Sequence, residues 1–380
     1  MNTGLTRKQR LVRSSVRSFC ERELRPIAGE IDQEARFPWE VVEKMGRLGY
    51  FGIQAPKEFG GAGMDSLSYS IIIEEISRVS ASVGLCVTVH NSVGLYPVLA
   101  FGSEDQKTRW AVPLARGEKI GAFCLTEPNA GSDARGIEST AVLKGDQFVI
   151  NANKVFVTNG GVADICLIFV KTGVPGGAVK VSVVVAERGT PGFVVGDLED
   201  LCGMRANPVS SIRLYDCAVP ESNLLGRDGD GLKIGLAALD AGRMGIAAQA
   251  VGIGQGALEE SLRYGKQRRQ FGVPIEKHQA IQMMLADMAT QVDASRLLVY
   301  RAAGLRDRGE PFSQAAAMAK LYASEASCRV TDMAVQIHGG YGYSKAYAVE
   351  RYYRDARVTR IYEGTSEVHR MVIFRGLLGK

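Results

Sequence analysis

The chain has 380 residues, of which 46% are hydrophobic and 23% charged, and its formal net charge is +5. This composition is typical of a globular protein with two or three domains and a large core. The basic excess is small and spread along the chain, so the sequence does not favour nucleic-acid binding. The seven cysteines form no Cys-x-x-Cys pair and the four histidines lie far apart. Buried free thiols in a reducing compartment are therefore expected, whereas a disulfide framework or a metal site is not.

Residues 1–120 are predicted to form an N-terminal α-helical domain. Val12, Val16 and Phe19 recur at helical spacing. The most apolar stretch, residues 83–101, contains several polar residues and a proline, which indicates a buried helix pair rather than a membrane span. The chain begins with a charged helical pattern instead of a secretory or transit peptide. We therefore expect a cytoplasmic protein, with the mature form of a mitochondrial matrix protein as the alternative.

The character of the sequence changes twice more. Residues 121–228 contain short alternating or fully apolar runs, closely spaced and without helices between them, which predict an antiparallel β-barrel or sandwich. Residues 229–380 return to the helical period. Long helices over about 232–264, 279–306 and 314–339, with a last one after Glu363, predict an antiparallel four-helix bundle.

One stretch near the C-terminus carries candidate chemistry. Glu363 is followed by Gly364, which can adopt backbone angles closed to other residues, and by Thr365, a natural helix N-cap. Glu363 is thus expected on a turn just before a helix. Burial beside apolar neighbours could raise its pKa toward neutrality and make it a base. On the residues alone, an exposed loop glutamate is the simpler interpretation.

Residues 361–367 resemble the C-terminal signature of acyl-CoA dehydrogenases, and the likeness extends from about residue 10 to residue 378. This resemblance implies an N-terminal α domain, a central β domain and a C-terminal four-helix bundle, with FAD at their junction and a homotetramer built as a dimer of dimers. It also implies that Glu363 removes the α-proton of an acyl-CoA thioester while flavin N5 takes the β-hydride, which gives a trans-2-enoyl-CoA. An electron-transferring flavoprotein would then be the electron acceptor.

Two stretches in the β region resemble the family's flavin-binding elements. Residues 123–133 match a loop of the form T-E-P-x-A-G-S-D, which implies that Leu125 and Thr126 contact the isoalloxazine ring, with Phe123 beside them. By the same likeness Ser132 touches the CoA moiety or the flavin phosphates. Phe156, where the family often has Trp, would stack on the flavin and Thr158 would lie near N5. Without the resemblance, a surface turn and a core aromatic would be the simpler interpretations.

Two further stretches resemble family elements that contact the flavin, the first of them the flavin of a neighbouring subunit. Residues 268–272 match R-x-x-F-G, so Arg268 would pair with the pyrophosphate. Residues 336–340 match Q-x-x-G-G, which lies against the ADP part, whereas His338 is expected to be structural. The other positions that the resemblance assigns to the cofactor are Gln270, Phe271, Gln279, Gln336, Gly339, Gly340, Thr365 and Glu367.

The resemblance also assigns residues to the acyl-CoA. They are Ser132, Asp240, Arg243, Tyr362 and Gly364, although on spacing alone Asp240 and Arg243 could be a surface ion pair. Isovaleryl- and long-chain-type relatives carry the catalytic glutamate at the position of Gly242, so a glycine here matches the short- and medium-chain arrangement. Gly84 stands where glutaryl-CoA dehydrogenases have an arginine for a distal carboxylate. The pattern is most similar to short-chain, butyryl-type enzymes, and branched or alicyclic acyl groups remain alternatives.

Other interpretations remain open on the sequence. An acyl-CoA oxidase or a nitroalkane-oxidase-like enzyme would keep the fold, and a non-catalytic flavin-bound scaffold or DNA-binding relative would keep it without turnover. Gly252, Gly254 and Gly256 lie in a helical pattern and follow no strand, so they indicate close helix packing rather than a dinucleotide fingerprint. Residues 228–231 lack the spacing of a calcium loop.

Overall fold

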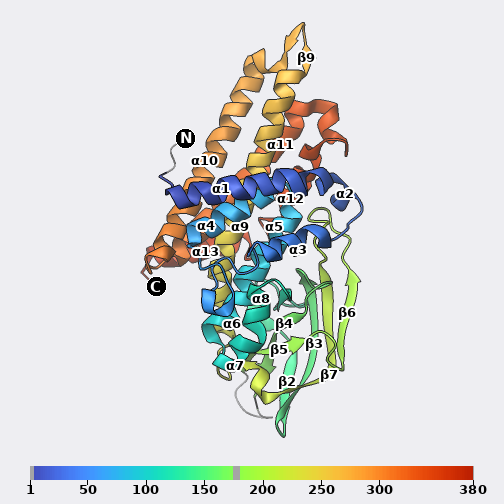
Figure 1. The fold of residues 1–380 in the computed structure, drawn as a ribbon, viewed down its shortest axis with the longest axis vertical. Helices are drawn as coiled ribbons and strands as arrows, with labels where there is room; N and C mark the ends of the chain where they lie inside the picture. Colours follow the sequence, from blue (N-terminus) through green and yellow to red (C-terminus); the bar gives the residue numbers. More distant parts are fainter. Residues whose placement is uncertain (1–3, 174–179, 380) are drawn as a thin grey trace.

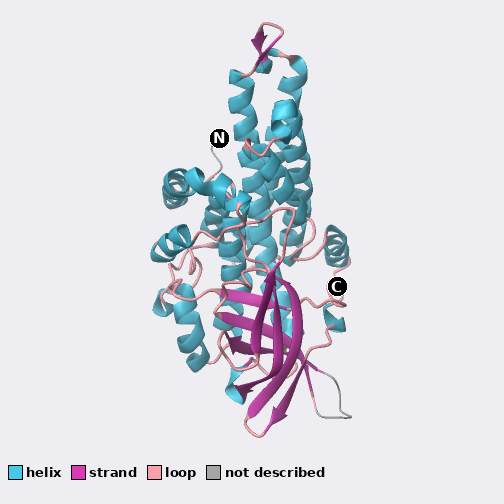
Figure 2. Cartoon of the chain, turned by 90° about the vertical axis from the view of Figure 1, so that its right-hand side faces the viewer, coloured by secondary structure: helices cyan, strands magenta, loops and turns pink. Residues whose placement is uncertain are grey.

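The structure is a computed structural model that describes residues 4–173 and 180–379. A layer of helices, a β-sheet and a long helical bundle follow one another along the chain, as predicted (Figures 1 and 2). The N-terminal helices are α1 (Arg7–Phe19), α2 (Ala28–Gln33), α3 (Trp39–Arg47), α4 (Ser66–Ser77), α5 (Ala81–Val89), α6 (Tyr96–Phe101), α7 (Glu104–Gln106) and α8 (Val112–Ala115).

The most apolar helix of the described residues is one continuous run rather than the predicted pair. A π-helical segment, η4 (His90–Leu95), joins α5 to α6, so Ala81–Phe101 forms 21 helical residues that are long and apolar enough to cross a membrane. Most of this run is buried inside the protein, which is the environment of a core helix. The His90 imidazole ties it to the sheet by accepting from the Gly121 N–H (3.1 Å) while Nε2 contacts the Leu114 carbonyl (3.0 Å). Burial lowers the pKa of His90 to about 4, so the ring is neutral at this joint.

The β region forms one mixed sheet in the order β6-β7-β3-β2-β4-β5-β8, with β1 beside β4. Its strands are β1 (Gly121–Cys124), β2 (Thr140–Lys144), β3 (Gln147–Val157), β4 (Ile165–Thr172), β5 (Lys180–Glu187), β6 (Phe193–Leu198), β7 (Ser210–Pro220) and β8 (Leu224–Leu225). The prediction of purely antiparallel pairing was wrong at β4, which pairs parallel to β1 and, at one position, to β2. Strands β4 and β5 are buried on both faces, as their apolar runs indicate.

Residues 229–379 contain five α-helices, one more than the sequence analysis identified in this region. They are α9 (Gly231–Gln267), α10 (Gln279–Asp307), α11 (Ser313–His338), α12 (Ala348–Val358) and α13 (Ser366–Leu377). Helices α9, α10 and α11 run side by side, and the β9–β10 hairpin (Arg269–Gln270 and Val273–Pro274) closes their far end (Figure 1). The sequence analysis missed α12, whose strongly charged surface masks its apolar face.

Glycines on α9 let the N-terminal helices approach its backbone closely. A Cβ atom at Gly252 would collide with the Glu74 carbonyl and lie 2.8 Å from Ser77 Cβ. At Gly256 it would lie 2.5 Å from the Arg78 carbonyl. The expected packing role of these glycines is confirmed.

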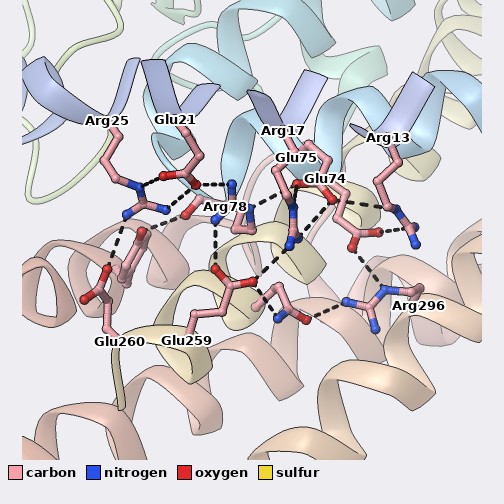
Figure 3. Close-up of polar contacts among 12 residues, drawn as sticks. Arg13, Arg17, Glu21, Arg25, Glu74, Glu75, Arg78, Glu259, Glu260 and Arg296 are labelled. Carbon is pink, nitrogen blue, oxygen red and sulfur yellow. Dashed lines mark hydrogen bonds and ion pairs between the residues drawn. The ribbon is translucent and has the colours of Figure 1, made fainter. Parts of the chain in front are cut away.

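Ion pairs around the buried Glu74, Glu75 and Arg78 join α1, α4, α9 and α10 at this contact (Figure 3). Arg78, only 2% exposed, contacts Glu75 (3.0 Å), Glu259 (2.8 Å) and Glu21 (2.5 Å). Arg17 also reaches Glu75, at 2.9 Å. Because such charges must stay paired when they are buried, the network fixes how the N-terminal helices sit on the bundle.

All seven cysteines are free, as expected, but two of them are not buried. Cys202 is exposed and Cys328 is half-buried. Within residues 4–173 and 180–379, no group of three His, Cys, Asp or Glu side chains could hold a metal ion.

Candidate active site

The site centres on the loop between α12 and α13. Glu363 and Gly364 both have left-handed backbone angles, with φ of 53° and 93°. Thr365 then caps α13 by accepting a hydrogen bond from the Val368 N–H (3.3 Å), as predicted. A positive φ is costly for a residue other than glycine, and such strain concentrates at functional sites.

The Glu363 carboxylate points at a gap in α9. A Cβ atom at Gly242 would lie 2.7 Å from Glu363 Cδ, so only glycine leaves room for the carboxyl group there. Glu363 Oε2 is buried and has no hydrogen-bond partner among the described residues. Burial raises the pKa of Glu363 to about 7, although the charges of Arg243 and Lys320 act to lower it. The group is therefore poised to accept a proton near neutral pH.

Lys320 was missed by the sequence analysis. It comes from α11, is fully buried, and donates a hydrogen bond of 2.6 Å from Nζ to the Gly364 carbonyl. Burial lowers its pKa to about 7, whereas the neighbouring Glu363 charge acts to raise it. The one available signal was a lone lysine inside the apolar run of residues 315–323.

Asp240 and Arg243 form the ion pair that their spacing allows, but they are not on an open surface. Arg243 is 5% exposed, and its Nε is buried without a partner among the described residues. Asp240 also accepts a hydrogen bond from Ser313 Oγ (2.8 Å). Tyr362 donates from its hydroxyl to Gln249 Oε1 (2.7 Å), which fixes the start of the Glu363 loop against α9.

A buried ion pair anchors the loop of residues 123–133, which is expected to contact the flavin, to strand β3. Lys154 Nζ on β3 lies 2.5 Å from Glu127 Oε1 and also contacts the Leu125 carbonyl (3.3 Å). The Val155 N–H donates to the Thr126 carbonyl (3.0 Å). Leu125 and Thr126 are half-buried, whereas Ser132 is exposed. Sequence analysis did not identify Lys154, whose burial depends on this pairing.

The aromatic side chain of Phe156 is exposed beside this loop. Phe156 is 60% exposed and has a φ of 53° where β3 loses its register with β7. A strained backbone that turns a large apolar ring outward suits the stacking of a planar ring system. Thr126 and Thr158, which carry hydroxyl groups, are half-buried. The residues present thus fit an isoalloxazine ring.

The remaining expected flavin contacts lie elsewhere in the chain. Arg268 lies over the Tyr341 ring, 5.4 Å from its centroid, and Phe271 is 94% exposed at the tip of the bundle (Figure 1). Between Lys320 and Gln336, α11 rises by about 24 Å. The predicted flavin-binding residues therefore form two groups that lie far apart within one chain. The tip group consists of Arg268, Gln270, Phe271, Gln279, Gln336, Gly339 and Gly340. His338 stacks on Tyr264 at 4.2 Å and bonds to the Ala334 carbonyl, as expected of a structural histidine.

Comparison with known families agrees with this arrangement along the whole chain. Three family profiles match, described as the acyl-CoA dehydrogenase N-terminal domain (residues 6–118), middle domain (122–217) and C-terminal domain (229–378). The chain is 48% identical to the short-chain specific acyl-CoA dehydrogenase of Clostridium acetobutylicum, over 98% of both sequences.

Solved structures give the same result. Butyryl-CoA dehydrogenase from Megasphaera elsdenii is 42% identical with a TM-score of 0.96, and the match covers both chains completely. A chain from a study of the electron transferring flavoprotein of Acidaminococcus fermentans is 45% identical, also with a TM-score of 0.96 and complete coverage of both chains. The chain therefore belongs to the acyl-CoA dehydrogenase family and is an enzyme that acts on a CH–CH group.

Proposed function

We propose that this enzyme oxidises a short-chain acyl-CoA to its trans-2-enoyl-CoA and that Glu363 is the base that removes the α-proton. The observation that carries the proposal is the Glu363 carboxylate, which is seated against Gly242 with Oε2 buried and unpartnered. Such an atom is available to an α-C–H group, and a pKa near 7 suits a general base at neutral pH. The similarity to short-chain and butyryl-CoA dehydrogenases supports the chain length.

FAD is the cofactor of this family, and its flavin ring supplies the acceptor for the β-hydride when bound. Phe156 would stack on the ring, while Leu125, Thr126 and Thr158 would face its polar edge. Phe123 and Ser132 would lie along the same loop, and Thr365 and Glu367 at the start of α13. None of these residues belongs to the tip group.

The tip group supports a shared flavin site. Arg268 is half-buried at the far end of the bundle, beside the exposed Gln270 and Phe271, and offers a guanidinium fork for a pyrophosphate. Gln279, Gln336, Gly339 and Gly340 extend that surface. Since these residues lie far from Glu363 in one chain, we infer that they serve the flavin of a second copy. A homotetramer built as a dimer of dimers would provide that copy.

The substrate would be oriented by the loop and by α9. The Gly364 and Glu363 backbone and the Tyr362 side chain line the approach to the base, and Asp240 with Arg243 borders it. The buried Arg243 would hold the acyl-CoA in place by charge. An electron-transferring flavoprotein is the proposed acceptor, since a structural neighbour comes from a study of such a protein. We also propose a cytoplasmic location, which the similarity to bacterial proteins supports.

The first experiment is an anaerobic absorbance titration of the FAD-loaded enzyme with butyryl-CoA. Bleaching of the oxidised flavin band, with enoyl-CoA formed, is the expected result. Bound FAD without bleaching would contradict a butyryl-type substrate and direct the search to branched, alicyclic or longer acyl groups. Failure to bind FAD at all would overturn the proposal.

The base is tested by Glu363→Gln, which keeps the size of the side chain and removes its proton affinity. We expect normal folding and FAD content and a loss of about three decades in turnover, as for other general bases. Turnover near the wild-type rate would exclude Glu363 from this role.

A further inference from the structure

One face of α9 lies against the Glu363 carboxylate and continues past it along the helix. Gly242, Gly245 and Gln249 stand at intervals of three and four residues and so share that face. Gly242 faces the Glu363 carboxylate, and Gln249 binds the Tyr362 hydroxyl. Gly245, between them, faces two side chains from the N-terminal helices.

Those two side chains are Tyr69 of α4 and Thr88 of α5. A Cβ atom at Gly245 would collide with the Tyr69 hydroxyl and lie 2.9 Å from Thr88 Cγ2 and 3.2 Å from Thr88 Oγ1. The missing side chain at Gly245 therefore leaves a gap that the tip of Tyr69 fills. A larger residue at position 245 would push the tyrosine away.

Both hydroxyl groups are buried and lack partners. Tyr69 is 1% exposed and Thr88 is 0% exposed. Neither Tyr69 Oη nor Thr88 Oγ1 has a hydrogen-bond partner in the described part of the chain. The Thr88 and Ser92 hydroxyls nevertheless lie close enough to Tyr69 to act on its pKa, so a small cluster of buried hydroxyl groups closes the end of the gap.

The spacing sets a length. Three residues of α9 separate Gly242 from Gly245, which is a rise of about 4.5 Å. An acyl chain with its α-carbon at Glu363 would meet the Tyr69 hydroxyl after about three further carbon atoms, given ordinary carbon–carbon bonds. A longer tail would have to displace a tyrosine ring packed between α4, α5 and α9.

We propose that Tyr69, seated in the gap at Gly245 and flanked by Thr88, is the stop that limits the acyl chain to about four to six carbons. This inference rests on the proposed function and assigns it a specificity-determining residue. The Tyr69 and Thr88 hydroxyls at the end of the gap also disfavour an apolar tail end, because such a tail cannot hydrogen-bond to them.

The test is a graded series at position 69. Tyr69→Phe removes only the hydroxyl, whereas Tyr69→Leu also removes the ring. We measure kcat/KM for butyryl-, hexanoyl- and octanoyl-CoA. The ratio of hexanoyl- to butyryl-CoA should rise in Tyr69→Phe, and the ratio of octanoyl- to butyryl-CoA should rise by about tenfold or more in Tyr69→Leu. The matched controls are Tyr352→Phe and Tyr352→Leu, because Tyr352 is equally buried and bonds to the Arg78 carbonyl.

Binding supplies a readout that does not require turnover. In a Glu363→Gln background, calorimetry gives the dissociation constants of butyryl- and octanoyl-CoA with and without Tyr69→Leu. Tighter octanoyl-CoA binding in the double variant, at unchanged butyryl-CoA binding, is the expected result. The proposal would be wrong if folded Tyr69→Leu kept the wild-type ratio of octanoyl- to butyryl-CoA kcat/KM. It would also be wrong if the Tyr352 controls changed that ratio equally. Bleaching of the wild-type flavin by butyryl-CoA would leave the proposed function intact in that case.

Discussion

At the scale of single residues, the site depends on two buried groups that share one environment. Glu363 and Lys320 both have a pKa of about 7, the first raised and the second lowered by burial. Their opposite charges favour each other's ionised form. Lys320 also holds the Gly364 carbonyl, so one side chain sets both the position of the catalytic loop and the charge beneath it.

This arrangement predicts a pH effect for Lys320→Met. If Glu363 is the base, as proposed, it must be ionised to act, so wild-type activity should rise with pH through about 7. Removal of the ammonium destabilises the carboxylate and should move this limb of the kcat/KM profile upward, by about one pH unit or less. The effect should be largest below pH 7, where Lys320 is charged.

Lys320→Arg is the matched control, because it keeps the charge and should leave the limb close to that of the wild type. An unchanged or lowered limb in Lys320→Met would show that the lysine has no electrostatic role. A loss of kcat without a shift of the pH profile would show that the role of Lys320 is limited to its hydrogen bond with the Gly364 carbonyl.

The local sequence predicted the conformation of the Glu363 loop, but it did not predict which residues from other helices lie near that loop. The turn before a capped helix follows from Gly364 and Thr365, which act through their own backbone. Lys320 and Tyr69 lie far from Glu363 in sequence, and their burial arises only when α11 and α4 pack against α9. No local pattern records that packing, so both were missed.

At the scale of elements, the flavin loop depends on strand β3. Glu127 accepts from Lys154 (2.5 Å) and from the backbone N–H groups of Glu138 (2.5 Å) and Ser139 (3.2 Å). Although burial acts to raise the pKa of Glu127, its bond to Lys154 and the other donors hold it below the usual range. The carboxylate therefore stays ionised and anchors the loop to the sheet.

Lys154→Met should release this anchor. It leaves the Glu127 charge buried without its cation, which should cost about 3 kcal/mol of unfolding free energy and much of the bound FAD. Adding Glu127→Gln should recover part of the stability, because no charge remains to be compensated. The free energy comes from denaturant unfolding and the FAD content from absorbance.

Lys180→Met is the control for this experiment. Lys180 pairs with Asp228 at 2.7 Å, but both side chains are well exposed, so its loss should cost less than about 1 kcal/mol. Equal losses from Lys154→Met and Lys180→Met would show that burial of the Lys154 pair is unimportant.

The element pattern itself was largely predictable. Residue periodicity indicated the order of helices, strands and helices, and the burial of β4 and β5 followed from their apolar runs. The parallel pairing of β1 with β4 was not predictable from local residues, because it brings together segments about 40 residues apart. Helix α12 was missed because charged residues dominate its composition.

At the scale of the whole molecule, buried ion pairs hold the N-terminal helices to one region of α9, and the hairpin carries Arg268 to the far end of the bundle (Figures 1 and 3). Glu363 and Arg268 thus lie near different ends of the helical bundle in one chain. If both serve one flavin, they must come from different copies of the chain. Symmetric assembly makes that exchange reciprocal.

Mixed oligomers test this directly. Glu363→Gln lacks the base, and Arg268→Ala should lose FAD affinity and most activity. The two variants are co-expressed with separate tags, and the mixed species is isolated. If each active site is shared between two chains, one site of the mixed species carries both substitutions and the other site carries neither. The mixed species should therefore regain about half of the wild-type activity per dimer. The measurement is turnover together with FAD content. A mixed species as inactive as its parents would place Glu363 and Arg268 in the same site of one chain, whereas an active Arg268→Ala parent would place Arg268 outside the flavin site. Tags exchanged between the two variants should give the same result, because a two-fold assembly has no preferred partner.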